Sequence, residues 1–192
     1  MCGMRPIETV WHGIRFRSRL EARWAIALEC LGADWEYEPD GFAFEDGTTY
    51  LPDFLLHGVA LDGVARDVYV EAKGRMQARS MRKCELFAES MPLYVVGSVP
   101  FERGPYSVEV LRRPYMGVKR GYAYYSSLFV DGQDEPLMLC AGDGALLARD
   151  GDSFDAQTTS LAYRVASSAR FDHMERPSDA QITECRTRAI GG

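Results

Sequence analysis

Apolar side chains recur at helical spacing in three stretches of the chain. The first stretch follows Ser18, which has Glu21 three residues later in the pattern of a capping box, and Gly32 stands at its end as a helix stop. The spacing predicts helices over residues 18–31, 78–90 and 158–170. The apolar residues of these helices are, in order, Leu20, Trp24, Ala27, Leu28 and Leu31; Met81, Cys84, Phe87 and Ala88; and Leu161, Ala162, Val165 and Ala169.

Shorter apolar runs lie between and after the first two predicted helices. Asp46-Gly47 between two such runs is a strong signal for a two-residue hairpin turn. Runs that are apolar at nearly every position are typical of strands covered on both faces. Strands are expected over residues 35–38, 42–45, 48–51, 67–73 and 92–96, and in the apolar stretch that ends at Pro52-Asp53. The resulting order of helix, three-stranded meander, helix and strand predicts an α/β fold.

The C-terminal half carries weaker signals. A tyrosine-rich stretch from Tyr122, a turn signal at Asp131-Gly132 and an apolar run that ends at Cys140 indicate a β-hairpin before the third helix. The last residues, from about Pro177, are polar and predict a frayed end. We therefore expect a core over residues 1–104, a β-rich extension with a terminal helix packed on the core over 105–176, and a flexible tail over 177–192.

Composition indicates a compact protein with one substantial core. The chain has 192 residues, of which 46% are hydrophobic, and no window approaches the run of about eighteen apolar residues that a membrane span needs. Five cysteines with no close pair argue against a disulfide framework and against a structural zinc site. Together with the lack of a signal-peptide pattern, these features predict a cytoplasmic protein with no membrane partner.

Two carboxylates and a lysine are set on neighbouring predicted strands. Asp53 ends one strand, and Glu71 and Lys73 lie near the end of the other. Because residues i and i+2 of a strand point to the same face, Glu71 and Lys73 project together. Hydrolysis of a phosphodiester needs a hard cation held by oxygen ligands and a positive group beside the developing charge, and these residues supply both. The alternative is an exposed ion pair on a solvated sheet face.

The motif and its surroundings resemble the PD-(D/E)XK nuclease superfamily. The matching residues are Pro52-Asp53 followed by Glu71-Ala72-Lys73. Residues 13–74 as a whole are similar to small predicted nucleases of phages and bacterial mobile elements. The resemblance implies a restriction-endonuclease-like core, with a C-terminal β-hairpin and helix added to it here. It also implies a Mg²⁺- or Mn²⁺-dependent DNA endonuclease, of the type that includes structure-selective resolvases, in a bacterial or phage-infected cell.

The resemblance also assigns roles to single residues. Asp53 and Glu71 would hold the metal, and Lys73 would orient the attacking water. In the resolvase-like branch an acidic residue on the first helix completes the metal site, which implies Glu21 as a third ligand and catalytic residue. Glu21 has a second interpretation, because a capping box uses the same residue to satisfy the start of the helix.

Basic residues are concentrated around the motif, although the chain is acidic. A net charge of −6 and a pI near 5.1 count against a protein that coats nucleic acid nonspecifically. Local groups before the first helix and after Lys73 instead predict contacts to DNA phosphates. The expected contacts are Arg15, Arg17, Arg19, Arg75 and Arg79.

Two other functions stay open beside an independent nuclease. The chain fits a non-enzymatic phage-type protein on a nuclease scaffold, which binds a host defence or DNA-processing complex and mimics nucleic acid through its acidic charge. It also fits a nuclease module that acts as a homodimer or inside a larger DNA-processing assembly. The intact set of Asp53, Glu71 and Lys73 speaks against the non-enzymatic function.

Overall fold

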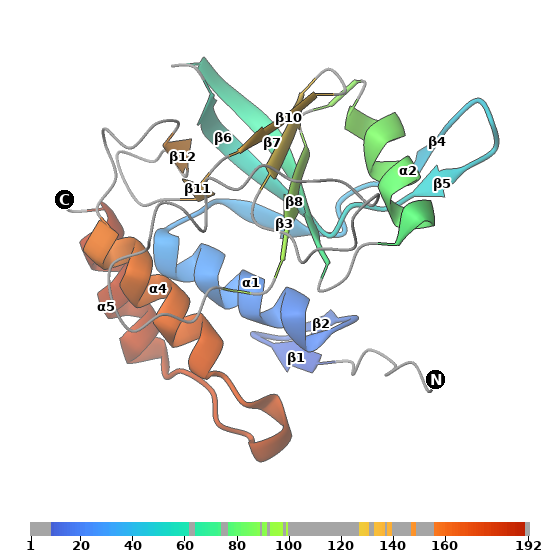
Figure 1. Cartoon of the computed structure of the whole chain (residues 1–192). Helices are drawn as coiled ribbons and strands as arrows, with labels where there is room; N and C mark the ends of the chain where they lie inside the picture. Colours follow the sequence, from blue (N-terminus) through green and yellow to red (C-terminus); the bar gives the residue numbers. More distant parts are fainter. Residues whose placement is uncertain are drawn as a thin grey trace.

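A six-stranded mixed sheet forms the centre of the molecule, with strand order β10-β9-β8-β7-β6-β3 (Figure 1). The computed structural model describes residues 9–61, 64–73, 77–88, 90–91, 93–97, 99, 127–130, 133–136, 138–139, 147–148 and 156–190. The sheet strands are β3 (Trp35–Tyr37), β6 (Phe54–Leu61), β7 (Val64–Ala72), β8 (Leu93–Val96), β9 (Ser127–Val130) and β10 (Gln133–Pro136). Because the described residues combine this sheet with four α-helices, the structure confirms the predicted α/β class.

The register of the central strands fixes which side chains share a face. β3, β6 and β7 form an antiparallel meander, with Phe54 opposite Val70 and Leu55 opposite Tyr69. β8 runs parallel to β7 after helix α2 (Ala78–Ala88), and β9 continues the sheet antiparallel to β8. The predicted burial of both faces is confirmed. Phe54 and Val70 point to one face and Leu55 points to the other, and all three are buried.

Helix α1 (Arg19–Leu31) covers one face of the sheet, and its ends agree with the predicted caps. The Ser18 side chain accepts a hydrogen bond from the backbone N–H of Glu21, and Gly32 ends the helix in the left-handed region with φ 75°. The helix is buried on nearly all sides, at Glu21, Ala22, Trp24, Ala25, Ile26, Ala27, Leu28, Cys30 and Leu31. Figure 1 shows why, since α4 (Ala156–Ser168) and α5 (Asp179–Ile190) lie against α1 on the side away from the sheet.

The opposite face of the sheet is covered by α2 and a small hairpin, β4 (Phe42–Ala43) with β5 (Thr49–Tyr50). The buried face of α2 is the predicted one, at Met81, Cys84, Phe87 and Ala88. The turn lies at the predicted place, with Gly47 at φ 78° and Asp46 Oδ1 accepting from the Thr48 N–H at 2.9 Å. It is not the predicted two-residue turn, because the Phe44 N–H donates to the Thr48 carbonyl at 2.9 Å and the loop spans residues 45–47. The hairpin reaches the sheet through aromatic edge contacts, because Phe42 and Tyr69 both pack against the Phe87 ring.

Two local expectations about the N-terminal half need correction. Asp53 does not end a strand but directly precedes β6, so the apolar residues after it form the strand. A further hairpin, β1 (Thr9–Trp11) with β2 (Ile14–Phe16), was not expected. Its turn uses His12 and Gly13, both at positive φ, and such a conformation is uncommon for a residue other than glycine.

The C-terminal segment differs most from expectation. The predicted tail contains α5, which begins with Ser178 and Gln181 bonded to each other and buries Ile182 and Cys185. Among residues 179–188 these two are the buried side chains, and most of their neighbours are polar, which is why periodicity did not reveal the helix. The expected β-hairpin is confirmed only in part. β9 lies in its first strand but pairs with β10, which precedes most of the expected apolar run, whereas β11 (Met138–Leu139) within that run pairs with β12 (Leu147–Ala148). Residues 122–126, 131–132, 137 and 140 of the predicted hairpin lie outside the described residues.

Within the described part of the chain, no helix combines the length and the apolar character that crossing a membrane requires.

The packing of α5 predicts a measurable stability difference. Ile182→Ala should lower the free energy of unfolding by about 2–4 kcal/mol, since it removes buried methyl groups from the contact with α1 and α4. Thr183→Ala, one residue away on the exposed side, should change it by less than about 0.5 kcal/mol. Urea unfolding of both variants gives the comparison, and equal small effects would contradict the packed helix.

Candidate active site

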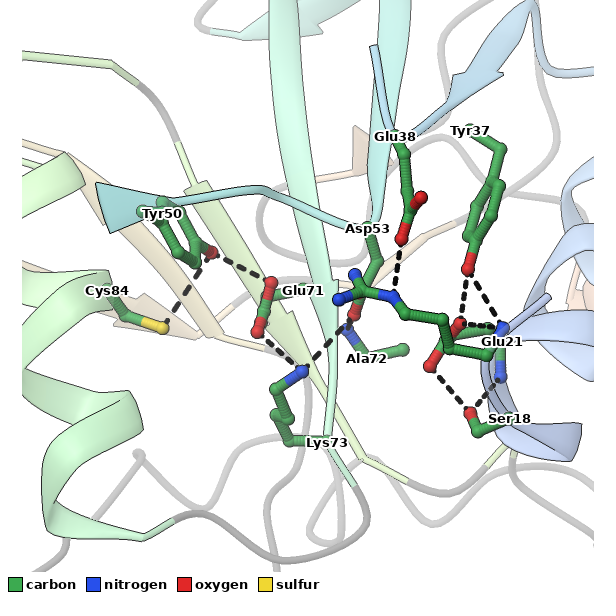
Figure 2. A network of polar contacts seen from close by, with 11 residues as sticks. Ser18, Glu21, Tyr37, Glu38, Tyr50, Asp53, Glu71, Ala72, Lys73 and Cys84 are labelled. Atoms are coloured by element: carbon green, nitrogen blue, oxygen red, sulfur yellow. Dashed lines mark hydrogen bonds and ion pairs between the residues drawn. The ribbon is translucent and has the colours of Figure 1, made fainter. Parts of the chain in front are cut away.

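Asp53, Glu71 and Lys73 meet at the open end of the β6–β7 hairpin (Figure 2). Because Phe54 lies opposite Val70, one further step along the antiparallel pair brings Asp53 beside Glu71. Lys73 follows β7 directly, and its Nζ lies 2.6 Å from Glu71 Oε1 and 3.6 Å from Asp53 Oδ2. The structure therefore brings together the three residues that the sequence placed on neighbouring strands.

The two carboxylates are buried, and each of their oxygens has a partner. The Asp53 side chain is 1% exposed; its Oδ2 accepts from the Ala72 backbone N–H at 2.8 Å and its Oδ1 from Arg17 Nη2 at 3.0 Å. Glu71 Oε2 accepts from the Tyr50 hydroxyl at 2.9 Å. These bonds hold both carboxylates in one orientation.

Burial of like charges dominates the electrostatics of the pair. Burial, and then the charge of Glu71, raise the pKa of Asp53 from 3.8 to about 7, although Lys73 acts in the opposite direction. Burial also works against the charged form of Lys73, but Asp53 and Glu71 outweigh it and raise the pKa of the ammonium group. The site thus favours added positive charge, and Lys73 stays protonated within it.

Glu21 lies at the edge of this group and acts as a cap. The Ser18 hydroxyl donates to Glu21 Oε1 at 2.7 Å, and the Arg17 backbone N–H and the Tyr37 hydroxyl donate to Oε2 at 3.0 and 2.6 Å. Both oxygens are therefore used at the start of α1, which favours the capping interpretation over a metal ligand. The charge of Glu21 nevertheless contributes to the raised pKa of Asp53.

Tyr37 and Tyr50 are functional candidates that the sequence analysis missed. Each donates its hydroxyl to a site carboxylate, Tyr37 to Glu21 and Tyr50 to Glu71. Burial and the neighbouring carboxylates raise the pKa of both phenols, so both remain donors at neutral pH. Strand-forming tyrosines occur throughout packed sheets, and no sequence signal marks these two as carboxylate donors.

A pocket of about 570 Å³ opens over Glu71, between the β4–β5 hairpin and the start of α2. Its walls include Phe42 and Tyr50, and Glu71 lies in its lining while the buried Asp53 lies behind. Its cationic lining residues are Arg17, Lys73, Arg79 and Lys83. A pocket with four cations around one carboxylate suits an anionic ligand such as a phosphate.

The predicted phosphate contacts are distributed unevenly around this pocket. Arg17 and Arg79 line it. Arg19 instead forms an ion pair with Asp172, in the 3-10 turn η2 (Phe171–His173), and Arg15 is exposed on β2. Arg75 lies outside the described residues.

The chemistry of the donors fits a hard cation held by two carboxylates. Among the described residues, no group of three or more His, Cys, Asp or Glu side chains is arranged to hold a metal ion. Asp53 and Glu71 still offer oxygen donors of the type that Mg²⁺ and Mn²⁺ prefer. Burial, and then the charge of Glu71, raise the pKa of Asp53, so its charged form is poorly stabilised, and a cation beside it would stabilise that form.

Comparison of the chain with protein-family models, with curated proteins and with solved structures finds no match. The resemblance to the nuclease superfamily therefore stays a prediction from the sequence.

The raised pKa of Asp53 predicts how stability depends on pH. In metal-free buffer the folded protein keeps a proton on Asp53 that the unfolded chain has released, so this contribution to stability is present below about pH 4 and is lost as pH rises to about 7. The stability of wild type relative to Asp53→Asn, which cannot titrate, should fall by roughly 2–3 kcal/mol between pH 5 and pH 7. Urea unfolding at both pH values measures it, and a constant or rising difference would contradict the assignment.

Proposed function

We propose that this chain is a metal-dependent nuclease of the PD-(D/E)XK type, which hydrolyses DNA phosphodiesters. The observation that carries the proposal is the meeting of Asp53, Glu71 and Lys73 at one hairpin end, beside a pocket lined by cations. Two buried carboxylates account for a metal site, and the cations account for a phosphate next to it. DNA is the proposed nucleic acid because the resemblance implies it.

The order of the elements supports the same family. The chain order is α1, the antiparallel strands β3, β6 and β7, the helix α2 and the parallel strand β8, which is the order of a restriction-endonuclease-like core with the β4–β5 hairpin inserted between β3 and β6. The motif carboxylates lie on two neighbouring strands of this order, since Asp53 directly precedes β6 and Glu71 lies near the end of β7.

Each residue of the site has a role in the proposed reaction. Asp53 and Glu71 would hold Mg²⁺ or Mn²⁺, which supplies a Lewis acid and makes a bound water more acidic. Tyr50 holds Glu71 Oε2, so Oε1 is the oxygen that faces Lys73. The ammonium group of Lys73 can donate a hydrogen bond to an attacking hydroxide or to a phosphoryl oxygen. This hydrogen bond stabilises the negative charge that develops in the transition state.

The remaining cations would hold the substrate. Arg79 and Lys83 lie one helical turn apart on α2 and line the same wall of the pocket. They are placed to contact phosphates next to the scissile one, while most of the surface stays acidic. This local arrangement explains how a chain with net charge −6 would bind nucleic acid.

One observation favours the alternative of a non-enzymatic binding protein. The four oxygens of Asp53 and Glu71 are already satisfied by Arg17, Ala72, Lys73 and Tyr50, so the cluster is neutralised without a metal. A scaffold that no longer bound metal would look the same. Metal binding and cleavage decide between the two functions.

Removal of a single carboxylate should abolish cleavage. Asp53→Asn and Glu71→Gln keep the shape and much of the hydrogen bonding of each side chain but remove a ligand charge, so metal-dependent cleavage should fall by about a hundredfold or more. The assay uses linear, nicked and branched DNA with Mg²⁺ and with Mn²⁺. Glu85→Gln on the exposed face of α2 is the matched control and should retain activity. Wild-type protein inert on every substrate would count against the enzyme.

Lys73 should matter for turnover rather than for affinity. Lys73→Ala removes a cation that touches both carboxylates, so the single-turnover rate should fall by roughly a hundredfold or more, as when one preorganised donor is lost. DNA affinity, from gel shifts in Ca²⁺, should stay within a few-fold. Lys83→Ala, which lines the same pocket without touching the carboxylates in an ion pair, should weaken binding more than the rate. Equal losses of rate and affinity in Lys73→Ala would make Lys73 a phosphate anchor only.

A further inference from the structure

The guanidinium of Arg17, an expected phosphate contact, bridges two carboxylates in the structure. Nη2 lies 3.0 Å from Asp53 Oδ1, and Nε forms an ion pair with Glu38 Oε1. The backbone of Arg17 is held, since its N–H donates to both Glu21 and Tyr37. The side chain is 52% exposed and lines the pocket. A fixed backbone with a half-exposed side chain allows the guanidinium to change partners without any movement of α1.

The contact of Arg17 decides which oxygen of Asp53 can accept a metal. Oδ2 accepts from the Ala72 N–H at 2.8 Å and lies 3.6 Å from Lys73 Nζ. Oδ1 is bonded to Arg17 alone among the described residues. A divalent cation at Oδ1 would stand within a few ångströms of the guanidinium, where the repulsion between them is strong. The metal can therefore reach Oδ1 only when Arg17 leaves.

The structure also shows where a displaced Arg17 would go and what holds it back. The pocket beside it already contains Arg79 and Lys83, so a phosphate there would offer the guanidinium a new bidentate partner. Glu38 acts against the exchange. It adopts φ 48°, a conformation that is costly for a residue with a side chain, and its backbone N–H donates to the Asp53 carbonyl at 2.9 Å. This places its carboxylate against Arg17.

We propose that Arg17 is an exchangeable counter-ion of Asp53, which blocks the metal position until a substrate phosphate draws it away. The inference rests on the proposed nuclease function and adds its regulation: metal loading and phosphate binding become coupled. Since coupling between two ligands is reciprocal, DNA raises metal affinity by the same factor by which metal raises DNA affinity. The ion pairs of Arg17 with Glu38 and Asp53 determine how strongly Arg17 competes with the metal.

The test measures Mn²⁺ binding by calorimetry in the absence of DNA. Arg17→Gln removes the competing charge and should bind Mn²⁺ at least about tenfold more tightly than wild type. Arg79→Gln removes one charge from the same pocket without touching Asp53, and should change Mn²⁺ affinity by less than about threefold. Arg17→Lys retains a cation and should stay within about threefold of wild type, which separates the charge from effects on packing. Thermal unfolding confirms that each variant is folded.

The second arm uses phosphorothioate-linked DNA, which resists cleavage. Mn²⁺ should increase its affinity for wild type by a larger factor than for Arg17→Gln, because the variant has no guanidinium to exchange. Mn²⁺ affinity that is unchanged or weaker in folded Arg17→Gln would overturn the proposal and leave Arg17 as a structural brace. Binding of Mn²⁺ by Arg17→Gln alone would support it strongly. A lack of Mn²⁺ binding in all four proteins would overturn the proposed nuclease function itself, and the inference with it.

Discussion

Two like charges buried side by side are the constraint on which the rest of the site depends. Asp53 and Glu71 lie almost without exposure at the end of one hairpin, and an uncompensated buried carboxylate costs several kcal/mol. Lys73 and Arg17 offset this cost from two directions, and backbone and phenol donors satisfy the remaining oxygens. The compensation is incomplete for Asp53, whose pKa remains near neutrality. A further cation beside Asp53 would therefore stabilise its charged form.

The short secondary-structure elements around the site position hydrogen-bond donors beside its carboxylates. The β4–β5 hairpin carries Tyr50 to Glu71, and its aromatic contacts with α2 and the sheet prevent it from moving away. On the other side, β3 carries Tyr37 to Glu21 and to the Arg17 backbone. Two short elements that add little to the core thus fix the geometry on both flanks of Asp53. The sheet supplies the carboxylates, and the edges supply the groups that orient them.

Local signals predicted the elements, and tertiary contacts decided the details of the site. The caps of α1 and the place of the Asp46-Gly47 turn depend on neighbours within a few residues, so sequence was sufficient to predict them. The convergence of Glu71 and Lys73 followed from strand periodicity alone. The pairing of Arg17 with Asp53 joins residues 36 positions apart, and no local pattern encodes it. Helix α5 was missed for a related reason, because Ile182 and Cys185 are buried against α1, which lies far away in the sequence.

The enclosure of α1 has a consequence for the order in which the protein acquires its structure. The helix that positions Ser18, Glu21 and Arg17 is covered on its outer side by α4 and α5, which follow it by more than a hundred residues in the sequence. Such contacts carry a large loop-closure entropy and form late. During synthesis the emerging N-terminal half would expose the outer face of α1, including Trp24, to solvent or to chaperones. The start of α1, beside Asp53, would become rigid only after α4 and α5 dock, so the synthesis of these two helices precedes the final geometry of the site.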